Sequence, residues 1–309
     1  MARRRSAVLD WLQYIGLRLV DVFLQCCPVE TNLRMARMLG DIVYALDRRH
    51  RQRAMANLRR SFPEMPQEQV ERLARRSMQS LLMFFVEMLF TTRLLRIDTW
   101  RRHVRLENFR QMLQLLLRRR SGLIMLTGHF GNFEICNYLL SVLGFSTVAV
   151  GRPLDNPYVN RWLMDVRQRK GSRIIAKKGA TDDVAAVLEN RGVVGFVADQ
   201  NAGRKGVFVD FFGRKASTYK SIALLAMQYE VPVVVGYAMR EGDDFRFVVG
   251  VQDIIYPEDW RGVDDPLMYI TQRYTRAIED FVRRDPGQYW WVHRRWKTRP
   301  KGEQPEEYD

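Results

Sequence analysis

The chain of 309 residues has little of what stabilises small disulfide-bonded or metal-bound folds: three Cys and four His. Cys26, Cys27 and Cys136 have no Cys-x-x-Cys spacing, which argues against a disulfide framework and against a zinc site. No segment rich in Gly, Ser or Pro reads as a linker, and neither a repeat nor a low-complexity tract is present. We therefore expect one main domain with extensions, no metal, and a reducing environment such as the cytoplasm or its membrane face.

Lysine is absent from the first 120 residues, which carry 24 Arg against 11 acidic residues and so hold +13 of the net charge of +15. A basic surface attracts polyanions: nucleic acid, anionic lipid or an acidic carrier protein. A merely solvated surface is the alternative, but the concentration of charge in one segment favours a functional basic face. We predict that this face comprises Arg3–Arg5, Arg48, Arg49, Arg51 and Arg53.

Residues 7–25 lack the small-residue cleavage site of a signal peptide, and they carry charges. On a helix the polar residues fall within a stripe of about 80°, formed by Asp10, Tyr14, Arg18, Asp21 and Gln25. We expect a membrane anchor that lies in the interface, or that packs its polar seam on the protein and faces lipid elsewhere. The pattern leaves open whether this helix spans the membrane, and an ordinary core helix is the alternative.

In the rest of the chain the expected secondary structure changes near residue 120, from helices alone to helices that alternate with strands. Helices are expected at 31–46, 48–60, 67–90 and 108–117, and then at 133–143, 157–169, 181–189, 216–228 and 267–283. Short apolar runs between the later helices read as strands at 123–127, 146–150, 193–198, 231–237 and 245–251. This alternation predicts an α/β fold, a mixed sheet flanked by helices on both faces. We divide the chain into an anchor helix (1–27) and a single domain (28–309), with a helical basic portion (28–120) and a catalytic core (121–300).

The first of these strands ends in Thr127-Gly128-His129-Phe130-Gly131-Asn132-Phe133-Glu134. Chemistry in α/β sheets usually sits at the carboxyl ends of strands. His129 would lie in the loop and Glu134 in the first helical turn, with Asn132 as N-cap. A carboxylate against one imidazole nitrogen fixes the tautomer and makes the other nitrogen a better base, which suits removal of a proton from an alcohol. A structural His at a helix N-terminus is the other interpretation.

His-x₄-Glu after a strand resembles the His-x₄-Asp/Glu signature of glycerolipid acyltransferases, and the chain is most similar to the lauroyl and myristoyl (late) acyltransferases of lipid A synthesis. Four further segments match that family in order: Arg152-Pro153-Leu154-Asp155-Asn156-Pro157, Ala198-Asp199-Gln200-Asn201, Gly206 to Gly213 with Ala216-Ser217-Thr218, and Gln288 to Pro300. The resemblance spans nearly the whole chain.

The resemblance implies direct acyl transfer at the cytoplasmic face of a Gram-negative inner membrane, with His129 and Glu134 as the catalytic pair. The donor would be an acyl carrier protein thioester, with no other cofactor, and the acceptor a hydroxyl of a lipid A precursor. Arg167, near Arg161 and Arg169, would stabilise an oxyanion or bind an acceptor phosphate, and Asp199 would have a supporting role. Arg152 would contact substrate, as would Asn201, Ser217 and Thr218, although a capping role fits these last three equally.

Several alternatives stay open at this stage. The acceptor could be a mannolipid, an ornithine lipid or a lysophospholipid, and the donor could be coenzyme A. A basic nucleic-acid-binding protein is the non-enzyme alternative, but no recognition motif supports it, so we expect no nucleic acid. Acyl-chain length, the acylated position and the oligomeric state are not encoded in these motifs. We interpret His293 as structural, because Trp290, Trp291 and Trp296 resemble an interfacial belt, and we discount Cys136 as a nucleophile because it has no basic partner.

Overall fold

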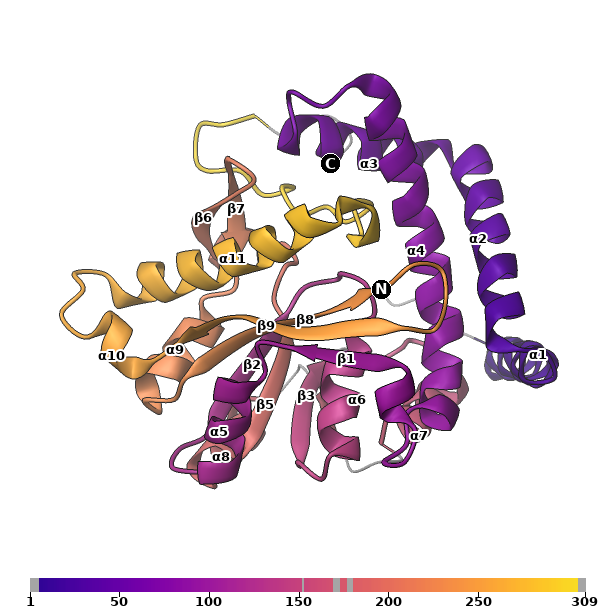
Figure 1. Cartoon of the computed structure of the whole chain (residues 1–309). Coiled ribbons are helices and arrows are strands. Elements are labelled where there is room, and N and C mark those ends of the chain that lie inside the picture. The colour runs from indigo at the N-terminus through magenta and orange to yellow at the C-terminus, as the bar shows by residue number, and fades with distance from the viewer. Residues whose placement is uncertain (1–5, 152, 169–172, 177–179, 305–309) are drawn as a thin grey trace.

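The computed structural model describes residues 6–151, 153–168, 173–176 and 180–304 (Figure 1). Four helices come first, and the sheet with its covering helices follows. The first helices are α1 (Ala7–Gln25), α2 (Val29–Leu46), α3 (Arg48–Ser61) and α4 (Gln67–Leu94). The later ones are α5 (Arg110–Arg118), α6 (Glu134–Val142), α7 (Pro157–Gln168), α8 (Ala180–Glu189), α9 (Ser221–Gln228), α10 (Pro257–Trp260) and α11 (Pro266–Arg284). The helices expected from the sequence are thus present, except that residues 216–220 are not helical.

The main sheet has seven strands in the order β1-β9-β8-β2-β5-β3-β4. All neighbours pair in parallel except β8 and β9, which are antiparallel, so the sheet is mixed as expected. The strands are β1 (Val104–Glu107), β2 (Leu123–Thr127), β3 (Thr147–Gly151), β4 (Arg173–Ala176), β5 (Val193–Val197), β8 (Val233–Arg240) and β9 (Phe247–Ile255). The sequence reading missed the two edge strands: β1 and β4 have only four residues each, too short for a visible period.

Helices cover both faces of the sheet, which confirms the expected architecture (Figure 1). Along β2 the side chains alternate between two hydrophobic clusters. Ile124 and Leu126 belong to the cluster beneath α8, α9 and α11, whereas Leu123 and Met125 belong to the cluster with α5 and α6. Because each face of the central strands is buried, their sequence reads as a continuous apolar run.

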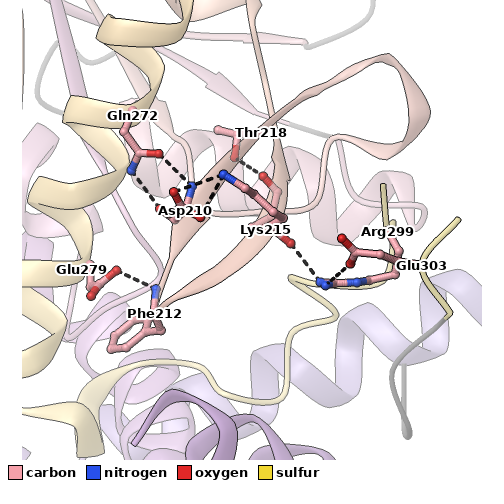
Figure 2. Close-up of polar contacts among 9 residues, drawn as sticks. Asp210, Phe212, Lys215, Thr218, Gln272, Glu279, Arg299 and Glu303 are labelled. Carbon is pink, nitrogen blue, oxygen red and sulfur yellow. Dashed lines mark hydrogen bonds and ion pairs between the residues drawn. The ribbon is translucent and has the colours of Figure 1, made fainter. Parts of the chain in front are cut away.

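A separate hairpin of β6 (Val207–Phe211) and β7 (Arg214–Thr218) lies beside α11. Figure 2 shows how polar contacts hold it: Gln272 of α11 bonds the backbone of Asp210 in both directions, and Glu279 accepts from the backbone of Phe212. On the other side Arg299 donates to the carbonyl oxygen of Lys215 (2.9 Å). The expected helix start at Ala216 is therefore wrong, because residues 216–218 pair with β6 and the helix begins only at Ser221.

The N-terminal helix α1 packs its polar seam on the protein. Asp10 is buried, its carbonyl oxygen accepts from Asn156 (2.8 Å), and Gln25 donates to the carbonyl of Leu89 (3.3 Å). Asn156 also caps α7 by accepting from two backbone N–H groups. The apolar side of α1 is exposed at Val8, Leu9, Trp11, Leu12, Leu19, Val20, Val22 and Phe23. The core-helix alternative is therefore wrong.

The second helix also exposes apolar side chains. Met35, Met38, Leu39, Ile42 and Leu46 recur at helical spacing and are 39–79% exposed. Figure 1 places α1 and α2 on the outer side of α4, away from the sheet. Among the described residues, no helix is both long enough and apolar enough to cross a membrane, so a spanning anchor finds no support in this structure.

The predicted arginine surface needs correction. Arg48 and Arg49 are exposed, but Arg51 donates to the carbonyl oxygens of Tyr44 and Ala45 at the end of α2. Arg53 is 6% exposed and reaches toward the carbonyl of Val292. Successive positions of one helix point in different directions, so a run of arginines does not form one face. Arg3–Arg5 lie outside the described residues.

Candidate active site

Two loops at the carboxyl ends of neighbouring parallel strands meet at His129. β2 pairs with β5 along its length, and the backbone N–H of Ala198 donates to the carbonyl of Thr127 (2.9 Å) just beyond the strands. His129 therefore faces Asp199, which is 3% exposed. The two are joined twice: His129 Nδ1 lies 2.7 Å from Oδ1, and the His129 backbone N–H donates to Oδ2 (2.9 Å).

The carboxylate at this site is held in its ionised form. Burial would raise the pKa of Asp199, but the charge and hydrogen bonds of His129 outweigh burial and hold that pKa well below its usual value. An ionised carboxylate only accepts hydrogen bonds, so the imidazole carries its proton on Nδ1. In the neutral form of the ring the lone pair is on His129 Nε2, and the side-chain amide of Gln200 approaches this atom from an exposed position (3.4 Å).

From the sequence we predicted that Glu134 is the carboxylate against the imidazole, whereas the carboxylate hydrogen-bonded to Nδ1 in the structure belongs to Asp199. Glu134 does begin α6, as expected, and it is half-buried. A role for Glu134 in catalysis stays a prediction. Asp199, for which we expected a supporting role, is the residue in direct contact with the imidazole.

A buried ion pair holds the loop between β2 and α6 in place. Glu87 of α4 (0% exposed) forms a two-point contact with Arg240 of β8 (5% exposed). The same carboxylate accepts from the side chain of Asn132 (3.1 Å), whose backbone N–H donates to the carbonyl of Ala238 (3.0 Å). Asn132 is thus not the N-cap that we predicted: its side chain faces the core, and Phe133 precedes the helix.

Gly131 allows the loop to lie against the sheet. Its φ is +54°, and a Cβ atom there would come within 2.1 Å of the carbonyl oxygen of Ala238. Its N–H donates to the carbonyl of Gln288 (3.1 Å), which joins the loop to the segment that follows α11. This backbone conformation and this close approach both require a glycine.

The C-terminal segment Tyr289–Trp296 closes the other side of the site. Tyr289 pairs with Phe130 as an isolated β-bridge, and the Trp290 N–H donates to the carbonyl of His129 (3.1 Å). Trp291 and Trp296 are each 1% exposed and belong to the core, so the expected interfacial belt is wrong for both.

Aromatic rings surround His129 on this side. Phe133 lies edge-on to the imidazole (centroids 5.1 Å apart), Trp290 lies at 5.1 Å, and Phe84 stacks on Phe133 at 4.8 Å. The neighbouring Phe85 is 49% exposed. The site therefore combines one polar edge with an apolar wall.

The remaining predicted residues have mixed outcomes. Asn201 is half-buried and donates to Thr298 Oγ1 (3.0 Å), while Ser217 and Thr218 are buried and bond nearby backbone carbonyls. Arg152 lies outside the described residues, as do Arg169 and the side chain of Arg167, which belongs to α7. Burial raises the pKa of the Cys136 thiol to about 12, which disfavours the thiolate needed of a nucleophile.

Two residues beside His129 were not assigned to the site from the sequence, and one of them, His293, was interpreted as structural. Gln200 stands directly after Asp199, and its side chain reaches His129. The ring of His293 lies 4.5 Å from that of His129. A signal was available for both, since each belongs to a matched motif, but the sequence does not say which motifs meet in space.

Comparison with known proteins identifies the family of this chain. The family model described as bacterial lipid A biosynthesis acyltransferase matches residues 2–298. The lipid A biosynthesis acyltransferase of Haemophilus influenzae is 25% identical over 97% of this chain and 94% of its own. The lauroyltransferase and the palmitoleoyltransferase of lipid A biosynthesis in Escherichia coli are each 24% identical, over 94% and 95% of this chain and 93% of each relative. The chain therefore belongs to the bacterial lipid A biosynthesis acyltransferase family, and it is an O-acyltransferase of that family.

Proposed function

We propose that this enzyme transfers a fatty acyl chain from an acyl carrier protein thioester to a hydroxyl of a lipid A precursor, with His129 as general base and Asp199 as its orienting carboxylate. The observation that carries the mechanism is the two-point contact between His129 and Asp199. The names of the relatives support the acceptor.

The proposed reaction is a direct transfer that needs no covalent enzyme intermediate. His129 Nε2 removes the hydroxyl proton, the hydroxyl oxygen bonds to the thioester carbon, and the resulting imidazolium is stabilised by Asp199. When the tetrahedral intermediate collapses, the C–S bond breaks and the thiolate takes the proton from His129. A positioned base of this kind contributes about 10²–10⁴-fold. Glu134 remains a candidate for a further role in this step.

The aromatic wall suits the acyl chain. Phe133 and Trp290, packed on the buried Phe84, offer apolar surface directly beside the imidazole, where the carbonyl end of a fatty acyl thioester would have to lie. The polar edge with Gln200 would then receive the acceptor hydroxyl.

We further propose that the exposed apolar surface of α1 and α2 lies in the interface of the inner membrane, on its cytoplasmic side. Single exposed apolar residues need no explanation, but so many on two helices mark an interaction surface. Amphipathic helices of this kind lie in the plane of the membrane interface. Arg48 and Arg49, exposed just after α2, would contact anionic head groups or the acidic carrier protein.

The test is a transfer assay with one labelled acyl group on two donors, acyl carrier protein and coenzyme A, against a lipid A precursor, a mannolipid, an ornithine lipid and a lysophospholipid. We expect transfer from the carrier protein to the lipid A precursor, and loss of at least about 10²-fold in His129→Ala. Cys136→Ala is the matched control and should keep its activity. Preference for another acceptor would overturn the substrate, and near-normal turnover of His129→Ala would overturn the mechanism.

A further inference from the structure

His293 contacts the proposed base although it lies far from it in sequence. The two imidazole rings have their centroids 4.5 Å apart and are inclined by 41°. On its other side His293 stacks on Trp290, with the ring planes 5° from parallel and the centroids 5.6 Å apart. Trp290 is itself bonded to the carbonyl of His129, so the three residues form one packed group.

The backbone around His293 is fixed. Its N–H donates to the carbonyl of Trp290 (3.0 Å), and its own carbonyl accepts from the buried side chain of Asn57 (3.3 Å). Asn57 also donates to the carbonyl of Trp291 (2.8 Å). A ring held from the backbone and stacked on an indole loses little freedom when it binds a ligand.

The hydrogen-bonding capacity of this ring is not used by the protein. Its Nε2 atom is enclosed and has no hydrogen-bond partner within the described part of the chain, although the residue as a whole is half-buried. An enclosed acceptor without a partner costs less than an enclosed N–H without one. The tautomer with its proton on Nδ1 is therefore favoured.

The charge state of His293 suits a hydrogen-bond donor that must not take up a proton in place of His129. Burial, helped by the neighbouring His129, lowers its pKa to about 4, although Asp199 acts in the opposite direction. At neutral pH the ring is uncharged. It can donate one hydrogen bond without repelling the positive charge that His129 acquires when it removes a proton.

We propose that His293 is a second catalytic residue, which donates its ring N–H to the thioester carbonyl oxygen as that oxygen becomes an oxyanion. As the hydroxyl oxygen bonds to the carbonyl carbon, the C=O electron pair moves onto oxygen, and the ring of His293, which lies beside His129, stabilises it by donating its N–H. The pair returns when the C–S bond breaks. This assignment rests on the proposed acyl transfer.

The first test replaces His293 with Phe, which keeps an aromatic ring on Trp290 but removes the donor. Loss of one oxyanion donor lowers kcat by about 10²–10³-fold and leaves KM for both substrates nearly unchanged. His103→Phe is the matched control: this half-buried His also packs on an aromatic ring, that of Phe245, but on β1's side of the molecule. A folded His293→Phe enzyme with turnover within about threefold of the unaltered chain would overturn the proposal.

A second pair of variants decides the matter if His293→Phe does not fold. Gln and Met have similar length and flexibility, but only Gln carries an N–H donor. We expect His293→Gln to turn over at least about tenfold faster than His293→Met, and equal rates would overturn the proposal. Turnover of the unaltered chain reports on acyl transfer itself, whereas only the ratio of the two variants reports on His293, so the two claims fail separately.

Discussion

In two regions of this molecule the usual distribution of side chains, with apolar groups inside and charged groups outside, is reversed. Beneath the catalytic loop, charged groups lie inside: Glu87 and Arg240 are almost completely buried. On α1 and α2, large apolar groups lie outside, with Leu46 79% exposed. The buried charges are paired and fixed by further hydrogen bonds, whereas the exposed apolar groups are not covered by any described part of the chain. Both arrangements cost stability in isolation, so each points to a role: positioning the loop in the first case, contacting lipid in the second.

The largest effect is expected from breaking the buried ion pair. Glu87→Gln removes the charge opposite Arg240 and weakens the contact to Asn132, which should lower the free energy of unfolding by about 3–5 kcal/mol. Glu68→Gln, in the exposed pair with Arg72, is the matched control and should cost less than about 1 kcal/mol. Urea unfolding measures both. Equal small losses would mean that the buried pair does not hold the loop.

A smaller effect concerns acid. The pKa of His293 falls from 6.5 to about 4 on folding, so between these values the unfolded chain binds a proton that the folded chain does not. Stability should therefore fall as the pH drops through this window, with one buried His contributing at most about 1.4 kcal/mol per pH unit. In His293→Phe this contribution disappears. Unfolding curves measured at several values between about pH 4.5 and 6.5, inside this window, should show that the free energy of unfolding depends less steeply on pH in the variant. Identical slopes would contradict the enclosure of the ring.

The apolar surface gives the opposite signature, a change in binding without a change in stability. Met38→Gln with Ile42→Gln should leave the free energy of unfolding within about 0.5 kcal/mol, because both side chains are exposed. Binding to vesicles should weaken by about 10²-fold or more, since each of the two buried aliphatic side chains contributes about 1.5 kcal/mol or more. Flotation with anionic vesicles measures this. Unchanged binding would remove α2 from the membrane contact.

The weakest effect is expected at the exposed arginines. Arg48→Glu with Arg49→Glu should weaken binding to anionic vesicles or to the carrier protein by about tenfold or more at low salt, because each basic residue near such a surface contributes about 1 kcal/mol. The loss should fade as salt is added, since screening acts over about 8 Å at physiological ionic strength. Arg118→Glu with Arg120→Glu, at the far end of α5, is the matched control. If both pairs behave alike, the effect is one of net charge and not of this surface.

Much of the fold could be predicted because its central strands are buried on both faces and its helices have clear periods. The site was only half predictable. In chain order β3 and β4 stand between β2 and β5, yet β5 lies next to β2 in the sheet. Local reasoning paired His129 with Glu134, five residues away, because strand order is a long-range property that no single motif encodes. The same limit hid the contact of His293 with His129 and the burial of Arg53, which depends on how α3 packs against the C-terminal segment.

The comparison of Asp199→Asn with Glu134→Gln tests the account most directly. An amide at position 199 cannot accept from both the His129 backbone N–H and Nδ1, since its nitrogen is a donor, so the imidazole loses its orientation or its tautomer. With acyl carrier protein as donor and a lipid A precursor as acceptor, we predict that Asp199→Asn lowers kcat by about 10³–10⁴-fold, and that Glu134→Gln loses distinctly less. Near-normal turnover of folded Asp199→Asn would contradict the assignment of Asp199 as the partner of the catalytic base.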